Sequence, residues 1–294
     1  MGQTIACANQ KGGVGKTTTV VNLATYLALA GDQVLVIDLD HQGNATSGFG
    51  VDRNAVDRSI YDGIIDSVPL SELVVPTGVA GVDLVPSSMA LAGADVELAP
   101  LEQRERRLAR LIEGSHDGYD YVVIDSPPSL GLLTVNALTA ADSVLIPIQC
   151  EYYALEGLTQ LIATINLVRD HLNPALEIKG VVLTMYDART NLSADVAAEV
   201  RRHLDGAVFD TVVPRNVRLS EAPSHGLPIA LYRPESRGAQ AYQALTLEFR
   251  GRAAIGAPPA PQSRPAAPGH DGNGEGPDAP AASADAPVAQ PVLA

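Results

Sequence analysis

The sequence predicts an α/β fold, with an open, mostly parallel, twisted sheet and helices on both of its faces. Short runs rich in β-branched residues alternate with longer helical patterns along the chain. Several runs are apolar at consecutive positions, as in VLVID at 34–38, YVVID at 121–125 and VLIPI at 144–148. Parallel strands that are covered on both faces have this composition. Strand–helix alternation of this length implies right-handed crossovers between parallel strands.

The individual elements follow from these runs and from the helical periodicity between them. The predicted strands are 4–8, 33–39, 82–85, 121–125, 143–148, 178–183 and 208–213. The predicted helices are 16–30, 101–113, 155–172, 193–204 and 238–250. Because ligands of open parallel sheets bind beyond the carboxyl ends of the strands, we expect the chemistry at the ends of the first, second and fourth strands.

Composition divides the chain of 294 residues into two parts. Residues 1–252 have the hydrophobic content of one large α/β domain. Residues 253–294 are dense in Pro, Ala, Gly and Asp and contain no aromatic residue. Such a segment buries too little apolar surface to offset the entropy of ordering it, so we expect a disordered Pro/Ala-rich tail.

The formal net charge of -14 argues against a protein that is constitutively attached to nucleic acid. The charge is unevenly spread, since residues 180–252 contain nine Arg against eight Asp or Glu. Any contact with DNA is therefore expected from this arginine-bearing end of the domain.

Cysteine content and hydrophobic runs limit the location of the protein. Cys7 and Cys150 form no CxxC pair, which favours neither a disulfide framework nor a metal site, and Cys7 is expected to be a buried residue of a strand. The N-terminus leads directly into a strand rather than a signal peptide, and no apolar run reaches the roughly 20 residues of a membrane span. A cytoplasmic protein is the expectation.

The first strand leads into a glycine-rich loop, QKGGVGKTT at 10–18, and then into a helix. Glycines let the backbone curl so that successive N–H groups point at a phosphate, and the helix N-terminus adds partial positive charge. Lys16 is expected to reach the β- and γ-phosphates, Thr17 to bind Mg²⁺ and Thr18 to contact the α-phosphate. The residues predicted to contact ATP in this loop are Lys11, Gly12, Gly13, Val14, Gly15, Lys16, Thr17 and Thr18.

The loop departs from the standard phosphate-binding pattern GxxxxGK[ST]. Gln10 occupies the position of the first glycine, and Lys11 adds a second lysine five residues before Lys16. Two lysines on one loop would crowd a single phosphate chain. We therefore expect Lys11 to point out of the site, toward the nucleotide of another subunit.

Three carboxylates lie at predicted strand ends beside this loop. Asp125 suits the outer shell of Mg²⁺, which keeps several of its waters, so we assign it a metal role through water. Asp40 lies just beyond the second strand and is predicted to orient or activate the attacking water. Asp38 ends the second strand and can support the phosphate site in the same way. The alternative interpretation is that Asp38 is only a strand-end cap or part of a structural ion pair.

These residues belong to segments that resemble the ParA/Soj chromosome- and plasmid-partition ATPases, a branch of the deviant Walker A class of P-loop NTPases. The segments are KGGVGKTTT (11–19), DLDHQGNATSGFG (38–50), YDYVVIDSPPSLGLLTVNAL (119–138), QCEYYALEGL (149–158), GVVLTMYDARTNLS (180–193) and VPRNVRLSEAPSHGLP (213–228). The resemblance extends from about residue 2 to residue 250, so only the tail lies outside it.

The resemblance implies a role for particular positions. Lys11 would cross an ATP-sandwich homodimer to the partner's phosphates, Asp40 would be needed for hydrolysis, and Asp125 would be the Walker B carboxylate. The residues implied at the adenine pocket and at the DNA surface are Pro214 and Asn216, and Arg189 and Arg218, respectively. Paired weak Arg–phosphate contacts on a rigid dimer would give non-specific DNA binding without net basicity.

The implied function is an ATP-dependent DNA-segregation ATPase. ATP binding would drive dimerisation and loading onto the double-stranded DNA of the nucleoid, and a ParB-type centromere-binding partner would stimulate hydrolysis and release. One departure from the family is His41, which stands directly after Asp40 where the family usually has Pro. A proline there would fix φ and stiffen the loop, so its absence affects hydrolysis rather than ATP binding.

Two other functions are compatible with the same fold. A MinD-like ATPase that cycles on membranes needs a C-terminal amphipathic helix, whereas this tail has Pro every few residues. A metabolic enzyme, such as a nitrogenase-reductase relative or a ligase, would need paired cluster cysteines or a small acid substrate. The positions of Cys7 and Cys150 and the ARTN and VRLSEAPSHG segments argue against this alternative.

Overall fold

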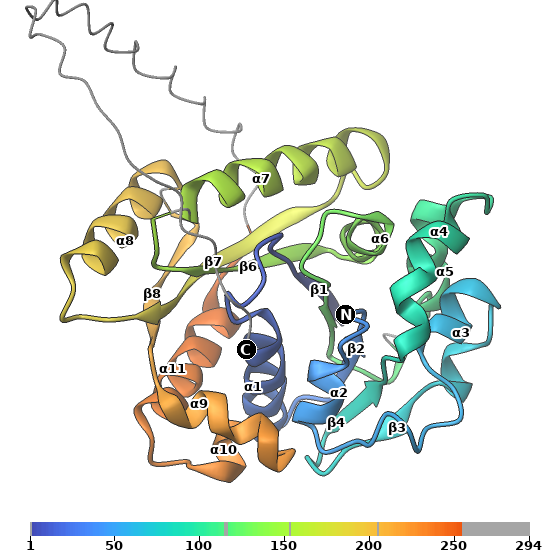
Figure 1. The fold of residues 1–294 in the computed structure, drawn as a ribbon, viewed down its shortest axis with the longest axis horizontal. Coiled ribbons are helices and arrows are strands. Elements are labelled where there is room, and N and C mark those ends of the chain that lie inside the picture. Colours follow the sequence, from blue (N-terminus) through green and yellow to red (C-terminus); the bar gives the residue numbers. More distant parts are fainter. Residues whose placement is uncertain (1, 115–116, 153, 205, 255–294) are drawn as a thin grey trace, which may run out of the picture. The chain divides into compact units, whose positions relative to one another are not determined.

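The computed structural model describes residues 2–114, 117–152, 154–204 and 206–254, and the predicted tail at 253–294 lies outside the described residues except for its first two. An eight-stranded sheet crosses the domain in the order β3-β4-β2-β5-β1-β6-β7-β8 (Figure 1). Its strands are β1 (Gln3–Cys7), β2 (Val34–Asp38), β3 (Val75–Pro76), β4 (Val82–Val85), β5 (Tyr121–Asp125), β6 (Ser143–Gln149), β7 (Glu177–Tyr186) and β8 (Val208–Pro214). All neighbours pair in parallel except β3, which pairs antiparallel with β4, so the predicted fold class is confirmed.

Helices of four to 18 residues lie between the strands and after the last one. The helices are α1 (Lys16–Leu29), α2 (Asn44–Gly48), α3 (Ile60–Ile65), α4 (Ala94–Leu98), α5 (Arg107–Leu111), α6 (Leu132–Ala140), α7 (Ala154–His171), α8 (Asn191–His203), α9 (Val217–Glu221), α10 (Ile229–Tyr232) and α11 (Arg237–Gly251). Turns of 3-10 helix occupy Leu70–Glu72, Met89–Gly93, Arg104–Arg106 and Ala222–His225. Among the described residues, no helix is both long and apolar enough to span a membrane.

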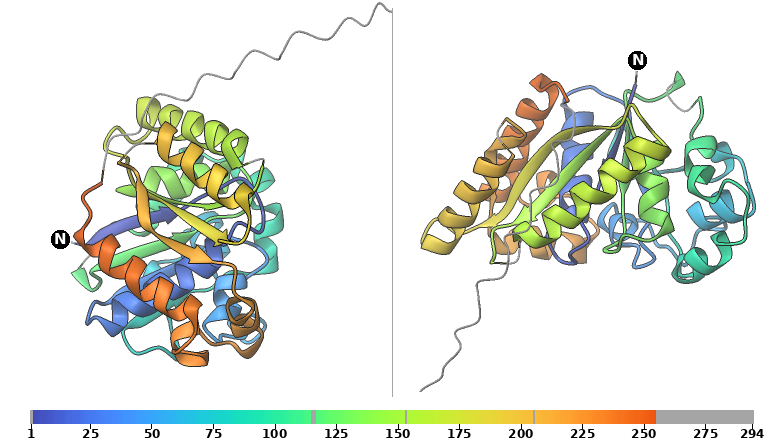
Figure 2. Two further views of the ribbon diagram at one scale, coloured as in Figure 1. Left: turned by 90° about the vertical axis from the view of Figure 1, so that its left-hand side faces the viewer. Right: turned by 90° about the horizontal axis from the view of Figure 1, so that it is seen from above.

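The core consists of two layers that the sheet separates. Alternate residues of one strand enter different layers, as Leu35 and Ile37 of β2 do on one face and Val34 and Val36 on the other. The first layer packs against α6, α7 and α8, and the second packs against α1 and α11 (Figures 1 and 2). Burial on both faces explains why the strands read as continuous apolar runs.

One predicted helix is wrong in extent. Residues 101–113 were expected to form a single helix, but the chain forms the 3-10 turn at 104–106 followed by the five-residue α5. Gln103 has a left-handed backbone with φ of 51°, which no α-helix interior accepts. Gly114, with φ of 81°, turns the chain a few residues after α5 ends.

The sheet topology brings three strand ends together. β1 lies between β5 and β6, and β2 pairs with the other side of β5. The chain crosses from β1 to β2 through α1, so the loop before α1 projects at the same edge as the ends of β2 and β5. The expected convergence at the first, second and fourth predicted strands, now β1, β2 and β5, is therefore found.

Candidate functional site

The loop between β1 and α1 has the backbone that its glycines predict. Gly13 and Gly15 have φ of 73° and 88°, values at which a side chain would strain the backbone. Gly15 caps α1, so the partial positive charge of a 14-residue helix faces the loop. The hydroxyl of Thr184, on β7, donates a 2.7 Å hydrogen bond to the Val14 carbonyl and fixes the loop to the sheet.

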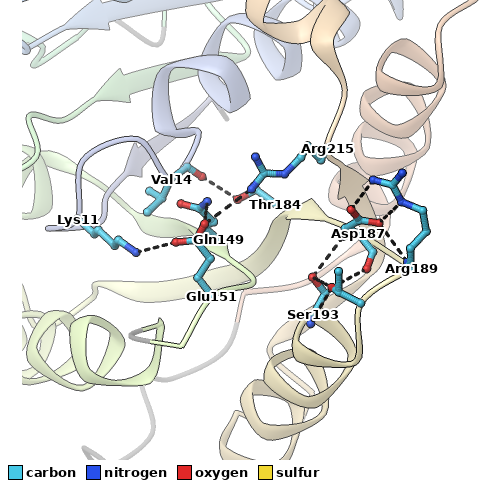
Figure 3. Close-up of polar contacts among 10 residues, drawn as sticks. Lys11, Val14, Gln149, Glu151, Thr184, Asp187, Arg189, Ser193 and Arg215 are labelled. Atoms are coloured by element: carbon cyan, nitrogen blue, oxygen red, sulfur yellow. Dashed lines mark hydrogen bonds and ion pairs between the residues drawn. The ribbon is translucent and has the colours of Figure 1, made fainter.

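The two lysines of this loop have different environments. Lys16 is only 6% exposed, and its Nζ donates to the Lys11 carbonyl at 3.3 Å. Burial lowers the pKa of Lys16, and the nearby Asp125 opposes this effect. The Lys11 side chain is 39% exposed and lies outside the loop, with its Nζ 3.3 Å from Glu151 Oε2 (Figure 3). The predicted outward direction of Lys11 thus agrees with its position.

Asp38 and Asp125 lie opposite each other at the ends of β2 and β5, and both are fully buried. Asp125 Oδ2 accepts a 2.6 Å hydrogen bond from the Thr17 hydroxyl, while Oδ1 is buried without a partner among the described residues. Burial, and then the charge of Asp38, raise the pKa of Asp125 well above its ordinary value. The Asp125–Thr17 pair therefore presents an acceptor oxygen that the protein itself leaves unsatisfied.

Asp38, by contrast, is fully engaged in holding the next loop. It accepts hydrogen bonds from the Asp40 N–H at 3.2 Å and from both the N–H and hydroxyl of Thr46, at 2.8 and 2.7 Å. Burial raises the pKa of Asp38 to about 6, against the opposing effect of these hydrogen bonds. The geometry matches the strand-end cap that the sequence left as an alternative.

Asp40 is 6% exposed and lines the same cavity as the glycine loop. Its Oδ1 accepts a 3.0 Å hydrogen bond from the Gln42 N–H and lies 3.5 Å from His41 Nδ1. The Ser87 hydroxyl donates to the Asp40 carbonyl at 2.5 Å, which fixes the start of the loop. His41, the residue that departs from the family pattern, is therefore in contact with the predicted water-positioning carboxylate.

A cavity of about 380 Å³ joins the glycine loop to an apolar wall. Its lining on the loop side includes Gly12, Gly13, Gly15, Lys16, Thr17, Thr18 and Asp40. The apolar wall consists of Val21, Met185, Leu219, Ala222, Pro223, Leu227 and Pro228. Met185 has φ of 50°, an unusual backbone for a residue with a side chain, and such outliers are enriched at functional sites.

Sequence reasoning assigned no role to this wall. Leu219 to Pro228 lie within the VRLSEAPSHGLP stretch, which contributes only to the family resemblance, and Met185 lies near the end of β7. The usable signal was a run of small and apolar residues that contains Pro223 and Pro228, because ligand pockets are lined mostly by apolar side chains.

The predicted adenine residues lie elsewhere. Pro214 and Asn216 line a second cavity of about 400 Å³, together with Arg189, and not the cavity of the glycine loop. The Asn216 side chain accepts the Arg218 N–H at 2.9 Å and so caps α9. Consecutive residues of β7 line the two cavities: Met185 lines the first and Tyr186 lines the second. The adenine role of Pro214 and Asn216 stays a prediction.

Both predicted DNA-contacting arginines are exposed and internally paired. The Arg189 side chain is 85% exposed and forms two hydrogen bonds with Asp187, at 2.9 and 2.7 Å (Figure 3). The Arg218 side chain is 51% exposed and lies 2.7 Å from Glu221. Such surface pairs contribute little to stability, so a phosphate can compete for either guanidinium.

Replacing Asp125 by Asn tests the buried charge directly. The raised pKa means that the folded protein binds this proton more tightly than the unfolded chain, so the wild type loses stability as pH rises from about 4. Asn keeps an acceptor for Thr17 and removes the charge. In urea unfolding with EDTA and no nucleotide, Asp125→Asn should be more stable than wild type by about 1–3 kcal/mol at pH 8, with the gap closing in acid.

The exposed Asp57, replaced by Asn, serves as the control for removal of one carboxylate and should leave the pH dependence unchanged. A variant of Asp125 that is less stable than wild type at pH 8 would contradict this description of the site.

Comparison with solved structures identifies similar proteins that bind nucleotide. Cobyrinic acid a,c-diamide synthase from Mycobacterium smegmatis, with bound ADP and magnesium, is 37% identical with a TM-score of 0.74, covering 84% of this chain and 93% of its own.

Sequence relatives give a more specific result. A family model described as an AAA domain matches residues 2–178. The sporulation initiation inhibitor protein Soj of Bacillus subtilis is 56% identical over 248 residues, which are 84% of this chain and 98% of Soj. The chromosome partitioning protein ParA of Myxococcus xanthus is 51% identical over 86% of this chain and 89% of its own. With these identities over nearly whole proteins, the chain belongs to the ParA/Soj family of chromosome-partitioning ATPases.

Proposed function

We propose that the protein is a DNA-partition ATPase that binds ATP·Mg²⁺ in the cavity of the glycine loop and hydrolyses it slowly, as a switch. The observation that carries this proposal is that the two lysines of one loop have different environments. Lys16 is buried inside the loop, where it can hold the phosphates of its own nucleotide, whereas Lys11 is exposed. The exposed ion pair of Lys11 with Glu151 is a weak surface contact that Lys11 can exchange for the phosphates of a second nucleotide.

The residues at the loop fit magnesium. The Thr17 hydroxyl and Asp125 are hard oxygen donors, and the buried Asp125 Oδ1 without a partner among the described residues is an acceptor that a cation or its water can use. Thr17 would bind the ion directly and Asp125 through water. The ion would supply charge neutralisation on the phosphates, while the loop glycines and Lys16 bind and orient them.

Asp40 is suited to orient the attacking water. It lies at the cavity wall next to the phosphate loop and is held by the Gln42 N–H. Its loop is in turn tied to Asp38 through Thr46, so a change at the strand end can reach Asp40. Slow intrinsic hydrolysis that a second protein stimulates is part of this proposal.

The proposed cycle is the one that the family resemblance implies. ATP binding brings two copies together as a sandwich in which Lys11 of each contacts the phosphates bound by the other. The dimer binds double-stranded DNA non-specifically through Arg189 and Arg218, and a ParB-type partner stimulates hydrolysis and release. The protein is then cytoplasmic and associated with the nucleoid.

The similarity to cobyrinic acid a,c-diamide synthase favours one other candidate, an ATP-dependent biosynthetic enzyme. The greater identity to Soj and ParA supports partition. Stimulation of ATP turnover by small carboxylic acids, with none by DNA and a ParB-type protein together, would support the biosynthetic enzyme.

The two lysines are expected to have separable roles. Lys16→Ala should abolish binding of a fluorescent ATP analogue, because the buried amine is the loop's own phosphate contact. Lys11→Ala should bind the analogue within about threefold of wild type but should stay monomeric in light scattering with ATP. Glu151→Gln is the matched control, since it frees Lys11 without removing it and should still dimerise. If Lys11→Ala dimerises as wild type does, Lys11 does not act across subunits.

DNA binding should be gated by ATP. In co-sedimentation with random-sequence duplex, wild type should bind with ATP and not with ADP or without nucleotide. Asp40→Ala should hold the DNA longer, because it retains ATP but cannot orient water. Arg189→Ala combined with Arg218→Ala should abolish DNA binding and keep basal ATP turnover. Absence of DNA binding under every nucleotide condition would refute the partition role and leave the nucleotide site standing.

A further inference from the structure

The turn that follows β2 places a histidine beside the proposed water-positioning carboxylate. The Gly43 N–H donates to the Asp40 carbonyl at 2.8 Å and closes a β-turn, of which His41 and Gln42 are the central residues. Gly43, with φ of 64°, then caps α2. The Arg53 guanidinium donates to the carbonyls of His41 and Gln42, at 3.4 and 2.9 Å. The backbone of the turn is therefore held by contacts that do not use the His41 side chain.

The Gln42 side chain determines which nitrogen of His41 carries the proton. Gln42 Nε2 lies 2.7 Å from His41 Nε2. Because an amide nitrogen can only donate, His41 Nε2 accepts, and the proton of the neutral ring is on Nδ1. His41 Nδ1 lies 3.5 Å from Asp40 Oδ1. The neutral ring therefore presents an N–H to the carboxylate of Asp40.

The two carboxylate oxygens of Asp40 have different surroundings. Oδ1 accepts the Gln42 N–H at 3.0 Å and is also the oxygen that His41 Nδ1 approaches. Oδ2 accepts no hydrogen bond from the residues that the structure describes, and Asp40 lines the cavity of the glycine loop. The turn thus holds one oxygen of Asp40 and leaves the other for a water in the cavity.

Protonation of His41 would change both of its contacts. A ring with protons on both nitrogens can no longer accept from the Gln42 amide, so Gln42 has to turn its amide oxygen to the ring or leave it. The same ring places a positive charge beside Asp40, and charge-assisted hydrogen bonds are about twice as strong as neutral ones. A carboxylate engaged in this way is a weaker acceptor for a water. Histidine side chains commonly change charge between pH 5 and 8, and the His41 side chain is 35% exposed to solvent.

Other charged groups near the turn also influence Asp40. They are Lys16 at the start of α1, Asp38 at the end of β2, Asp125 at the end of β5, and Arg53, which binds the turn itself. Burial raises the pKa of Asp38 to about 6, so Asp38 also changes charge in this pH range. The effect of His41 is therefore the difference between the wild type and a variant at position 41.

We propose that His41 is a positioning residue that slows ATP hydrolysis in acid, because protonated His41 pairs with Asp40. This inference rests on the proposed ATPase function and on the role of Asp40 in it. Neutral His41 shares Oδ1 with the Gln42 N–H and leaves the charge of Asp40 available to the attacking water. Protonated His41 engages that charge. Since Lys16 and the glycine loop bind the phosphates, the affinity for ATP should depend little on His41.

The test is the rate of phosphate release at saturating Mg·ATP, measured between pH 6 and pH 8. From pH 8 to pH 6, the kcat of the wild type should fall about tenfold more than that of His41→Asn, the size expected for one charge-assisted hydrogen bond. Asn supplies an amide N–H near the place of Nδ1 but cannot gain a proton. The KM for Mg·ATP and ATP-dependent dimerisation should change with pH equally in both proteins.

His41→Pro is a second variant that keeps the turn. His41 occupies the first central position of the turn, where proline is favoured, and its N–H forms no hydrogen bond in the described part of the chain. Proline supplies neither the donor nor the charge of the imidazole ring. The additional fall of kcat in acid should therefore be absent from His41→Pro, as from His41→Asn. An additional fall that persists in both variants would overturn the proposal.

His203 provides the matched control. Its Nδ1 lies 3.5 Å from Glu199 Oε1 and its side chain is 36% exposed, values close to those of His41 and Asp40. His203 belongs to α8, which packs on the opposite face of the sheet from α2. His203→Asn should retain the full fall of kcat in acid. If it loses the fall as the His41 variants do, the effect does not come from the contact with Asp40 and the proposal fails.

The outcomes separate this inference from the function on which it rests. Hydrolysis by Asp40→Ala at the wild-type rate would refute the role proposed for Asp40 itself. An inactive Asp40→Ala, together with one pH dependence of kcat for the wild type and both His41 variants, refutes only the role of His41. A pH effect of His41 on KM alone also overturns the inference, because His41 would then act on ATP binding rather than on the water.

Discussion

The hydrogen bond between Thr17 and Asp125 is the contact on which the rest of the site depends. It joins the first turn of α1 to the end of β5, and β5 lies between β1 and β2 in the sheet. The bond uses one oxygen of a fully buried carboxylate and leaves the other without a partner among the described residues. The folded protein therefore retains an electrostatic cost that a bound cation would relieve, which makes binding at this point favourable.

The Asp38 network extends this constraint to the hydrolytic side of the cavity. Asp38 lies opposite Asp125 on the neighbouring strand, and its charge adds to the effect of burial in raising the pKa of Asp125. Asp38 is held by Thr46, whose hydroxyl accepts the Ser87 N–H, and the Ser87 hydroxyl binds the Asp40 carbonyl. Asp38, which faces Asp125 at the proposed metal site, thus also fixes the position of Asp40. The proposed sites of metal binding and of water positioning therefore depend on one hydrogen-bond network.

Much of the fold followed from local pattern. All seven predicted strands occur, because strands buried on both faces must be apolar at successive positions and β-branched residues favour them. The two-residue β3 was missed, since Val75 and Pro76 are too few to show a period. Helix α6 was missed because its residues are mostly buried, so LLTVNALTA shows no amphipathic stripe. The predicted helix at 101–113 is interrupted at Gln103, whose positive φ could not be predicted from its residue type.

The site divides in the same way. Lys16, Thr17, Asp40 and Asp125 were found because a glycine loop and strand ends fix their positions through chain connectivity alone. Met185 and the wall at 219–228 were not, because they meet the loop only when β7 is placed two strands from β1. The ion pair of Lys11 with Glu151 likewise depends on a contact between segments that are distant in sequence.

The most direct test of the central claim is the number of protons released when preformed Mg·ATP binds. Calorimetry at pH 7.5, in buffers with different ionisation enthalpies, measures this number for the wild type and for Asp125→Asn. Because burial raises the pKa of Asp125, binding of Mg·ATP should release more protons from the wild type than from the variant. Equal proton release by wild type and variant, at equal affinity for Mg·ATP, would contradict the claim that the bound cation relieves the electrostatic cost of the buried Asp125 carboxylate.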